Sequence, residues 1–234
     1  IKNRWPFRIH ATYNESITRF LNVLEEINRE TPLNGLLWFF DHAETVSDEN
    51  LLRIKALNGG IAIQHRMAYQ GENFIKRYGM PAAARTVPIK KMLDMSIKVG
   101  MGTDGTRVAS YNPWVGLYWL TTGKTVGGLK YMADENILGR SQALKLFTSG
   151  SAALVDLQAD RGLLTENYLA DFVILSEDYF SIPEDKILSI ESKLTIVNGK
   201  AVYADDDFRE FAKPMPRAEP EWSPVNFYGG YQKN

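Results

Sequence analysis

Short apolar runs alternate with helical patterns through roughly the first 150 residues, and no other feature limits the fold of this chain as strongly. Strands are predicted at Phe7–Ala11, Leu36–Phe40, Ile61–Ile63 and Lys98–Gly102. The segments between them carry apolar residues at helical spacing, as in Glu15–Arg29. Connections of this length cannot be hairpins, so the strands are predicted to run parallel. The sequence therefore predicts an α/β fold built on a parallel sheet.

The starts of several helices can also be predicted. Ser47 is a suitable N-cap, and Pro88 and Pro113 are each placed to open a helix. A further helix is predicted from Ser141 to Leu154. The residues before Pro88, from about 66 to 85, are predicted to form a loop.

The pattern changes after Asp156, where short strands follow one another without helices between them. They are predicted at Ala170–Leu175, Lys193–Val197 and Lys200–Tyr203. Asn198-Gly199 separates the last two and is a strong hairpin signal. A small antiparallel β region is therefore expected beside the α/β part.

Composition excludes several classes of site and partner. Lys and Arg number 27 and Asp and Glu 28, for a net charge of −1. No basic excess exists to neutralise phosphates or anionic lipid, so nucleic acid and membranes are not expected partners. The chain has no cysteine, which excludes disulfides and thiolate metal sites and leaves the cellular compartment open.

The residues best suited to chemistry lie at predicted strand ends. His10, His42 and His65 each follow or end a strand, and Asp104 follows the next one. They recur roughly every 31 residues, the length of one unit in a (β/α)8 barrel of ~250 residues. Strand C-termini are where such barrels place catalytic groups, and imidazole with carboxylate suits a divalent metal. Any single histidine is more often a surface or satisfied core residue, so the pattern alone leaves both interpretations open.

At these residues the chain resembles a metal-dependent hydrolase of the amidohydrolase superfamily, in the branch grouped as amidohydrolase family 3. The matching strand segments are Ile9-His10-Ala11, Asp41-His42-Ala43-Glu44, Ile63-Gln64-His65 and Gly102-Thr103-Asp104. The resemblance continues through Gln142–Thr148, Leu169–Leu175 and Thr195–Lys200. It departs from the branch at Thr12-Tyr13-Asn14, where a Gly-Asp pair is more common, and at Gly105-Thr106, where a proline is common.

The resemblance implies roles for four residues. His10 and His42 match the fifth- and sixth-strand histidines that bind metal or orient metal-bound water. Asp104 matches the eighth-strand carboxylate, which ligates metal and shuttles a proton as the catalytic residue. His65 is not a standard ligand of the superfamily, and it is either a substrate contact or a bystander. The implied cofactor is a divalent metal, with zinc as the expected ion and one or two ions in the intact enzyme.

The resemblance also implies an organisation. Residues 1–155 match the second half of a TIM-like (β/α)8 barrel, strands five to eight, and residues 156–213 match part of a small β-sandwich. Residues 214–234 form a tail rich in proline and aromatic residues, which is expected to pack on the body. The family's first-strand His-x-His pair and fourth-strand ligand have no counterpart, so the chain is interpreted as a fragment whose partner is the N-terminal half.

Two functions remain as hypotheses. The first is hydrolysis of carbon–nitrogen bonds in small molecules such as cyclic amides or N-acyl compounds, by metal-activated water. The second is a non-catalytic barrel that binds ligands or regulates, as the exoenzyme-regulation label on some members of this branch suggests. In either case the isolated chain is expected to be inactive and to self-associate through open sheet edges.

Overall fold

A parallel four-stranded sheet forms the centre of the computed structural model, which describes residues 1–105 and 108–213. Its strands are β1 (Phe7–Ala11), β2 (Trp38–His42), β3 (Gly60–Gln64) and β4 (Lys98–Gly102), in the order β1-β2-β3-β4. All neighbouring pairs are parallel, as predicted. Because parallel strands share a direction, their carboxyl ends meet at one edge of the sheet.

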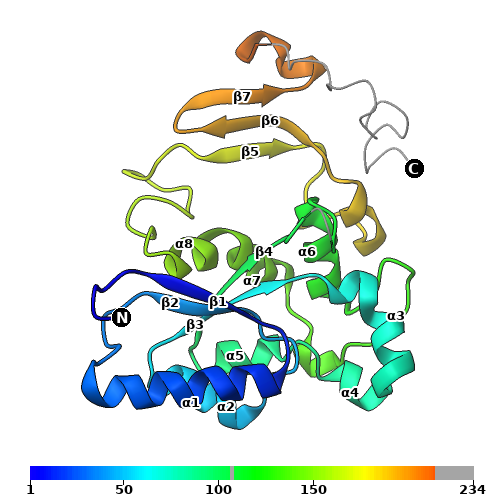
Figure 1. Cartoon of the computed structure of the whole chain (residues 1–234). Helices are drawn as coiled ribbons and strands as arrows, with labels where there is room; N and C mark the ends of the chain where they lie inside the picture. Colours follow the sequence, from blue (N-terminus) through cyan, green and yellow to red (C-terminus); the bar gives the residue numbers. More distant parts are fainter. Residues whose placement is uncertain (106–107, 214–234) are drawn as a thin grey trace, which may run out of the picture.

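Helices connect these strands and cover the sheet (Figure 1). The described helices of this part are α1 (Asn14–Glu30), α2 (Asp48–Ala56), α3 (Met67–Tyr78), α4 (Met80–Ala84), α5 (Ile89–Asp94), α6 (Pro113–Thr122), α7 (Arg140–Lys145) and α8 (Ser151–Leu154), with a one-turn 3-10 helix at Asp134–Asn136. A π-helical turn, Leu146–Gly150, joins α7 to α8, so the helix predicted from Ser141 to Leu154 is interrupted in the middle.

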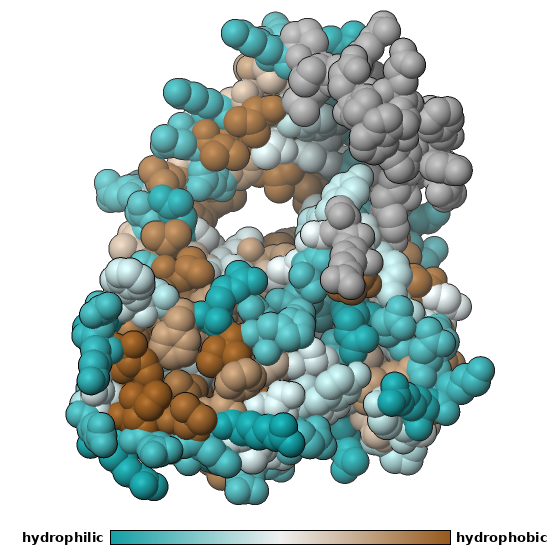
Figure 2. Space-filling model, in the orientation of Figure 1, coloured by the Kyte–Doolittle hydropathy of each residue, from teal (hydrophilic) through white to brown (hydrophobic). Residues whose placement is uncertain are grey.

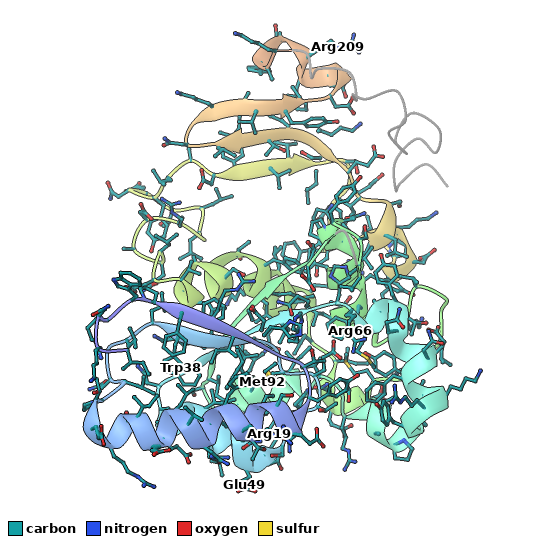
Figure 3. The ribbon with its side chains drawn as sticks, viewed as in Figure 1. Arg19, Trp38, Glu49, Arg66, Met92 and Arg209 are labelled. Atoms are coloured by element: carbon teal, nitrogen blue, oxygen red, sulfur yellow. The ribbon has the colours of Figure 1, made fainter. Side chains whose placement is uncertain are left out.

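The sheet face towards α1 and α2 holds the largest core side chains. Trp38 and Phe40 are 2% and 0% exposed, and their rings pack edge to face with centroids 5.5 Å apart. Trp38, labelled in Figure 3, lies between the sheet and the helices, and its Nε1 donates to the Leu57 carbonyl at 3.1 Å. From α1, Ile17 and Leu21 are fully buried, because helical spacing places both on one side of the helix. This packing holds β1 and β2 against the helices beneath the sheet.

The other face of β3 and β4 is covered by α8 and the π-helical turn. The approach is close because β4 has a glycine at position 100. A Cβ on Gly100 would lie 2.9 Å from the Ser151 Cα. Ser151 also accepts a hydrogen bond from the Met101 backbone N–H and donates one to the Met101 carbonyl, at 3.1 and 2.9 Å. These contacts secure β4, and with it the position of Asp104 beyond its end.

Two predictions about this part were wrong in detail. The segment predicted as a loop before Pro88 contains α3 and α4. The apolar run Leu36–Phe40 is displaced by two residues from the strand, because Leu36 belongs to the preceding turn and the strand continues through Asp41 and His42. No helix in the described residues is long and apolar enough to cross a membrane.

A three-stranded antiparallel sheet lies apart from the central sheet (Figure 1). Its strands are β5 (Phe172–Leu175), β6 (Ser192–Val197) and β7 (Lys200–Ala204), with 3-10 helices at Glu184–Ser189 and Asp206–Phe211. The predicted Asn198-Gly199 hairpin is confirmed, with φ of +49° and +72° at its two residues. The boundaries drawn at residues 155 and 213 stay predictions, and the tail lies outside the described residues.

Candidate metal centre

The carboxyl edge of the central sheet brings two of the predicted residues into direct contact. His10 precedes the last residue of β1, and His42 ends β2. The Nδ1 of His10 and the Nε2 of His42 are 2.9 Å apart, and the ring centroids are 4.4 Å apart. A bond between two ring nitrogens needs one donor and one acceptor, so the two rings share a single proton.

An unusual backbone conformation turns His42 towards His10. In the parallel register the partner of His10 is Asp41, and the partner of His42 is Ala11. At His42 φ is +77°, and the Ala43 N–H donates to the Asp41 carbonyl at 3.2 Å, which closes a three-residue turn. Positive φ at a non-glycine residue costs about 1–3 kcal/mol and is characteristic of functional sites. The strained residue is therefore the one that ends β2 and presents its imidazole towards His10.

The pair differs in exposure, and burial changes the chemistry of one ring. His10 is exposed at the open side of β1, whereas His42 is 7% exposed. Burial, with a smaller contribution from His10, lowers the pKa of His42, and the carboxylates of Asp104, Glu44 and Asp41 oppose this shift. The His42 imidazole is consequently neutral near pH 7, the form that binds metals. Its Nδ1 is buried and has no hydrogen-bond partner among the described residues.

Asp104 lies beyond the end of β4, at an exposed position with φ of +51°. Its carboxylate raises the pKa of both His42 and His65 against the effect of burial. Within residues 1–105 and 108–213 the structure records no hydrogen bond to this carboxylate. Asp104 therefore lies close enough to act on both imidazoles electrostatically while its own oxygens stay available.

His65 follows β3 and is fully buried. Burial lowers its pKa to about 4, with the Ser110 backbone and Asp104 acting in the opposite direction. Its ring lies 6.0 Å from that of Tyr69, and its Nδ1 would be 3.2 Å from a Cβ at Gly116. Neither ring nitrogen has a hydrogen-bond partner of normal geometry in the described structure. Its role as a substrate contact stays a prediction.

Charged residues that sequence reasoning gave no role surround this edge. The Asp41 carboxylate, on the residue paired with His10, accepts from Arg8 Nε at 2.9 Å. Glu44 is 1% exposed and accepts two hydrogen bonds from Arg66, which is labelled in Figure 3. Asp41 and Glu44 flank His42 in sequence, and this position was the only sign in the sequence that they belong to the site. The partner of Glu44 lies 22 residues away and could not be read from the sequence.

The donor chemistry of this edge suits a divalent cation. Two zinc–nitrogen bonds of about 2.05 Å at a tetrahedral angle place the nitrogens about 3.3 Å apart, slightly more than the His10–His42 distance. A small separation of the rings would therefore admit an ion in place of the shared proton. In the described residues, however, no three His, Asp or Glu side chains lie together in an arrangement that could hold a metal. Metal binding by His10, His42 and Asp104 stays a prediction.

Known proteins are similar to this chain over most of its length. The profile of the amidohydrolase family matches residues 2–203. The putative amidohydrolase YtcJ of Bacillus subtilis (strain 168) is 29% identical over 199 residues, which cover 83% of this chain and 37% of that protein.

Solved structures share the fold. An uncharacterised metal-dependent hydrolase from Pyrococcus horikoshii OT3 aligns with a TM-score of 0.63 and 23% identity, covering 77% of this chain and 35% of that one. Atrazine chlorohydrolase TrzN from Arthrobacter aurescens TC1, solved with zinc, aligns with a TM-score of 0.59 and 19% identity, covering 87% and 45%. The chain spans between about a third and a half of the length of these relatives. With the profile matching nearly all of its described residues, the chain belongs to the amidohydrolase family.

Proposed function

We propose that this chain supplies part of the active site of a metal-dependent hydrolase that cleaves carbon–nitrogen bonds in small molecules such as cyclic amides or N-acyl compounds. The observation that carries the proposal is the His10–His42 contact at the carboxyl edge of the sheet, with Asp104 close by. Membership of the amidohydrolase family supports the type of reaction. The proposal also interprets β1–β4 as strands five to eight of a (β/α)8 barrel. In such a barrel the active site lies at the carboxyl ends of the strands.

The residues that would hold the metal are His10, His42 and Asp104, with further ligands from outside the described residues. When bound, a divalent ion such as zinc lowers the pKa of a coordinated water and polarises the scissile carbonyl. Zinc is the proposed ion because imidazole and carboxylate donors suit it and because TrzN was solved with zinc.

The chain's own side chains supply the remaining steps. Asp104 has an exposed carboxylate without a recorded hydrogen bond, so it can accept a proton from the attacking water and deliver it to the leaving nitrogen. The His42 imidazole, which lies at the carboxyl edge of the sheet, can help to stabilise the oxygen on which negative charge develops. His65 is proposed as a contact to the substrate, from its position directly after the carboxyl end of β3.

A second candidate function is a non-catalytic barrel that binds ligands or regulates. The observation in its favour is that the two imidazoles hydrogen-bond to one another, and that no group of three metal-binding side chains exists among the described residues. The two candidates differ in whether His10, His42 and Asp104 respond to a metal.

Zinc titration of the chelator-treated chain by calorimetry tests the proposal. We expect binding with a dissociation constant above about 1 μM, because catalytic zinc takes three protein ligands and no three His, Asp or Glu side chains lie together in the described residues. His10→Ala, His42→Ala and Asp104→Ala should each weaken binding, whereas His65→Gln is the matched control and should not. Zinc binding that none of the three substitutions alters would overturn the proposal and favour the non-catalytic alternative. We also expect the isolated chain not to hydrolyse amides, for the same reason.

A further inference from the structure

A network of hydrogen bonds joins the loop after β1 to the loop after β2, directly beyond His10 and His42. The sheet pairing first continues past the strand ends, where Ala43 N donates to the Ala11 carbonyl at 3.0 Å and Thr45 N donates to the Thr12 carbonyl at 3.3 Å. Beyond these two bonds the backbones no longer pair directly. The side chain of Asn14, the first residue of α1, takes over the connection.

Asn14 is bonded to the second loop through both its backbone and its side chain. Its Oδ1 accepts from the Ser47 backbone N–H at 2.8 Å and from Asn50 Nδ2 at 2.8 Å. Its own backbone N–H donates to Thr45 Oγ1 at 3.0 Å. One residue at the start of α1 is therefore bonded to three residues at the start of α2.

The partners of Asn14 are themselves fixed. Asn50 is 2% exposed, and its Nδ2 also donates to Thr18 Oγ1 at 2.7 Å while its Oδ1 accepts from Arg53. Ser47 is the N-cap of α2, and its side chain accepts from the Asn50 backbone N–H at 3.2 Å. Asn50 Nδ2 thus donates to two acceptors, Asn14 Oδ1 and Thr18 Oγ1, and removal of the Asn14 oxygen would take one of them from a buried amide.

The need for such a connection comes from the strained backbone where β2 passes into the second loop. His42 and Ala43 both have positive φ, at +77° and +47°, and neither is a glycine. Strained conformations persist only where surrounding contacts hold them. Asn14 lies four residues after His10, and Ser47 lies five residues after His42, so their bond closes a loop around the His10–His42 contact.

We infer that Asn14 is a positioning residue that holds the His10 and His42 rings beside one another, so that a small movement apart would let both bind one metal ion. This inference rests on the proposed function, because it gives the contact a purpose in the active site. It assigns no chemistry to Asn14, whose side chain touches neither imidazole in any recorded hydrogen bond.

The test compares Asn14→Ala with two matched variants of the full chain. Asn14→Asp keeps the acceptor Oδ1 and should behave as the unaltered chain. Asn28→Ala removes a similar bond at the other end of the same helix, where Asn28 Oδ1 accepts from Leu33 N at 2.8 Å, and should also leave the site unchanged. Asn14→Ser, too short to reach both Ser47 and Asn50, replaces Asn14→Ala if that variant does not fold.

Two readouts are needed, one of them without metal. Nuclear Overhauser contacts between the His10 and His42 rings in the metal-free chain report the pair itself. Zinc affinity, followed by the shifts of the same rings, should fall about tenfold in Asn14→Ala, the lower end of the effect of outer contacts on metal sites.

The result we expect is loss of the ring contact and weaker zinc binding in Asn14→Ala alone. An unchanged ring contact in a folded Asn14→Ala, or an equal loss in Asn14→Asp or Asn28→Ala, would overturn the inference. If no variant, including the unaltered chain, shows a zinc response while Asn14→Ala still loses the ring contact, the positioning role stands and the proposed metal function fails.

Discussion

The two sheets of this molecule use similar residues and differ in what covers them. All five residues of β2 are buried, whereas three of the four residues of β5 are exposed. Phe40 in β2 is 0% exposed and Phe172 in β5 is 36% exposed. Figure 2 shows apolar side chains on the three-stranded sheet and a hollow between it and the α/β body. Burial is therefore set by the helices that cover a sheet, because β5 (FVIL) is exposed although it is more apolar than the buried β2 (WFFDH).

The difference has a consequence for where function can be built. The central sheet holds its strand ends rigidly enough to keep His42 and Asp104 in positive-φ conformations. The three-stranded sheet has exposed apolar side chains on β5 and β7, including Val173 and Val202, and its positive φ values lie in the Asn198-Gly199 turn, where the hairpin itself requires them. The candidate metal centre accordingly lies on the covered sheet.

The largest expected effect compares one phenylalanine from each sheet. Phe40→Ala should lower the free energy of unfolding by about 3–5 kcal/mol, because it leaves a cavity in a closed core. Phe172→Ala should lower it by about 1 kcal/mol or less, because that ring already contacts solvent. Urea unfolding of both variants measures the difference. Equal losses would show that the two sheets are equally well packed in solution, against this comparison.

Acidification should affect the covered region through His65. The imidazole has a pKa of about 4 in the folded chain and about 6.5 when unfolded. Above pH 6.5 both states hold a neutral ring, and between pH 6.5 and 4 only the unfolded chain takes up the proton, so stability falls with pH. The loss reaches about 3 kcal/mol near pH 4.

Urea unfolding at pH 7 and pH 4 measures this loss, and comparison with His65→Asn separates it from the contribution of other groups. The variant should lose less stability than the unaltered chain on acidification. The described residues of β5–β7 contain no histidine, so that sheet cannot produce the same dependence. Identical losses of stability in the unaltered chain and in His65→Asn would mean that His65 takes up its proton as readily in the folded chain as in the unfolded one.

A smaller effect is expected from one ion pair in each region. Arg66→Ala should cost about 2–3 kcal/mol, because it leaves the Glu44 carboxylate buried and unpaired while part of Arg66 already reaches solvent. Lys193→Ala, which breaks the Lys193–Asp205 pair of the three-stranded sheet, should cost less than Arg66→Ala, because both side chains are about 30% exposed and water screens the pair. Thermal unfolding in low and high salt compares the pairs, and a larger loss for Lys193→Ala would reverse the comparison.

The sequence was a good guide wherever one strand or turn decided the outcome. The four parallel strands, the Ser47 cap and the Asn198-Gly199 hairpin depend on local patterns, and the structure has each of them. The parallel order also places His10, His42 and Asp104 at one edge without any knowledge of side-chain contacts.

Two kinds of feature could not be predicted from the sequence. One is contacts between segments that lie far apart in the chain, and the other is a helix whose apolar spacing is interrupted by polar residues. In α3 the buried residues Met67, Gly71 and Phe74 follow helical spacing, but the polar run Gln70-Gly71-Glu72-Asn73 hides it. The pairing of Glu44 with Arg66 and the bonds from Asn14 to Ser47 and Asn50 arise only when neighbouring loops meet.

We propose that the carboxyl edge of the parallel sheet assembles metal ligands from separate strands. Anomalous diffraction at the zinc edge, from crystals of the chain soaked with zinc, tests it most directly. We expect a peak within about 2.0–2.2 Å of one nitrogen each of His10 and His42, the distance of zinc–imidazole bonds, and its absence in crystals of His42→Ala. Zinc bound elsewhere on the chain, with the His10–His42 contact intact, would contradict the account.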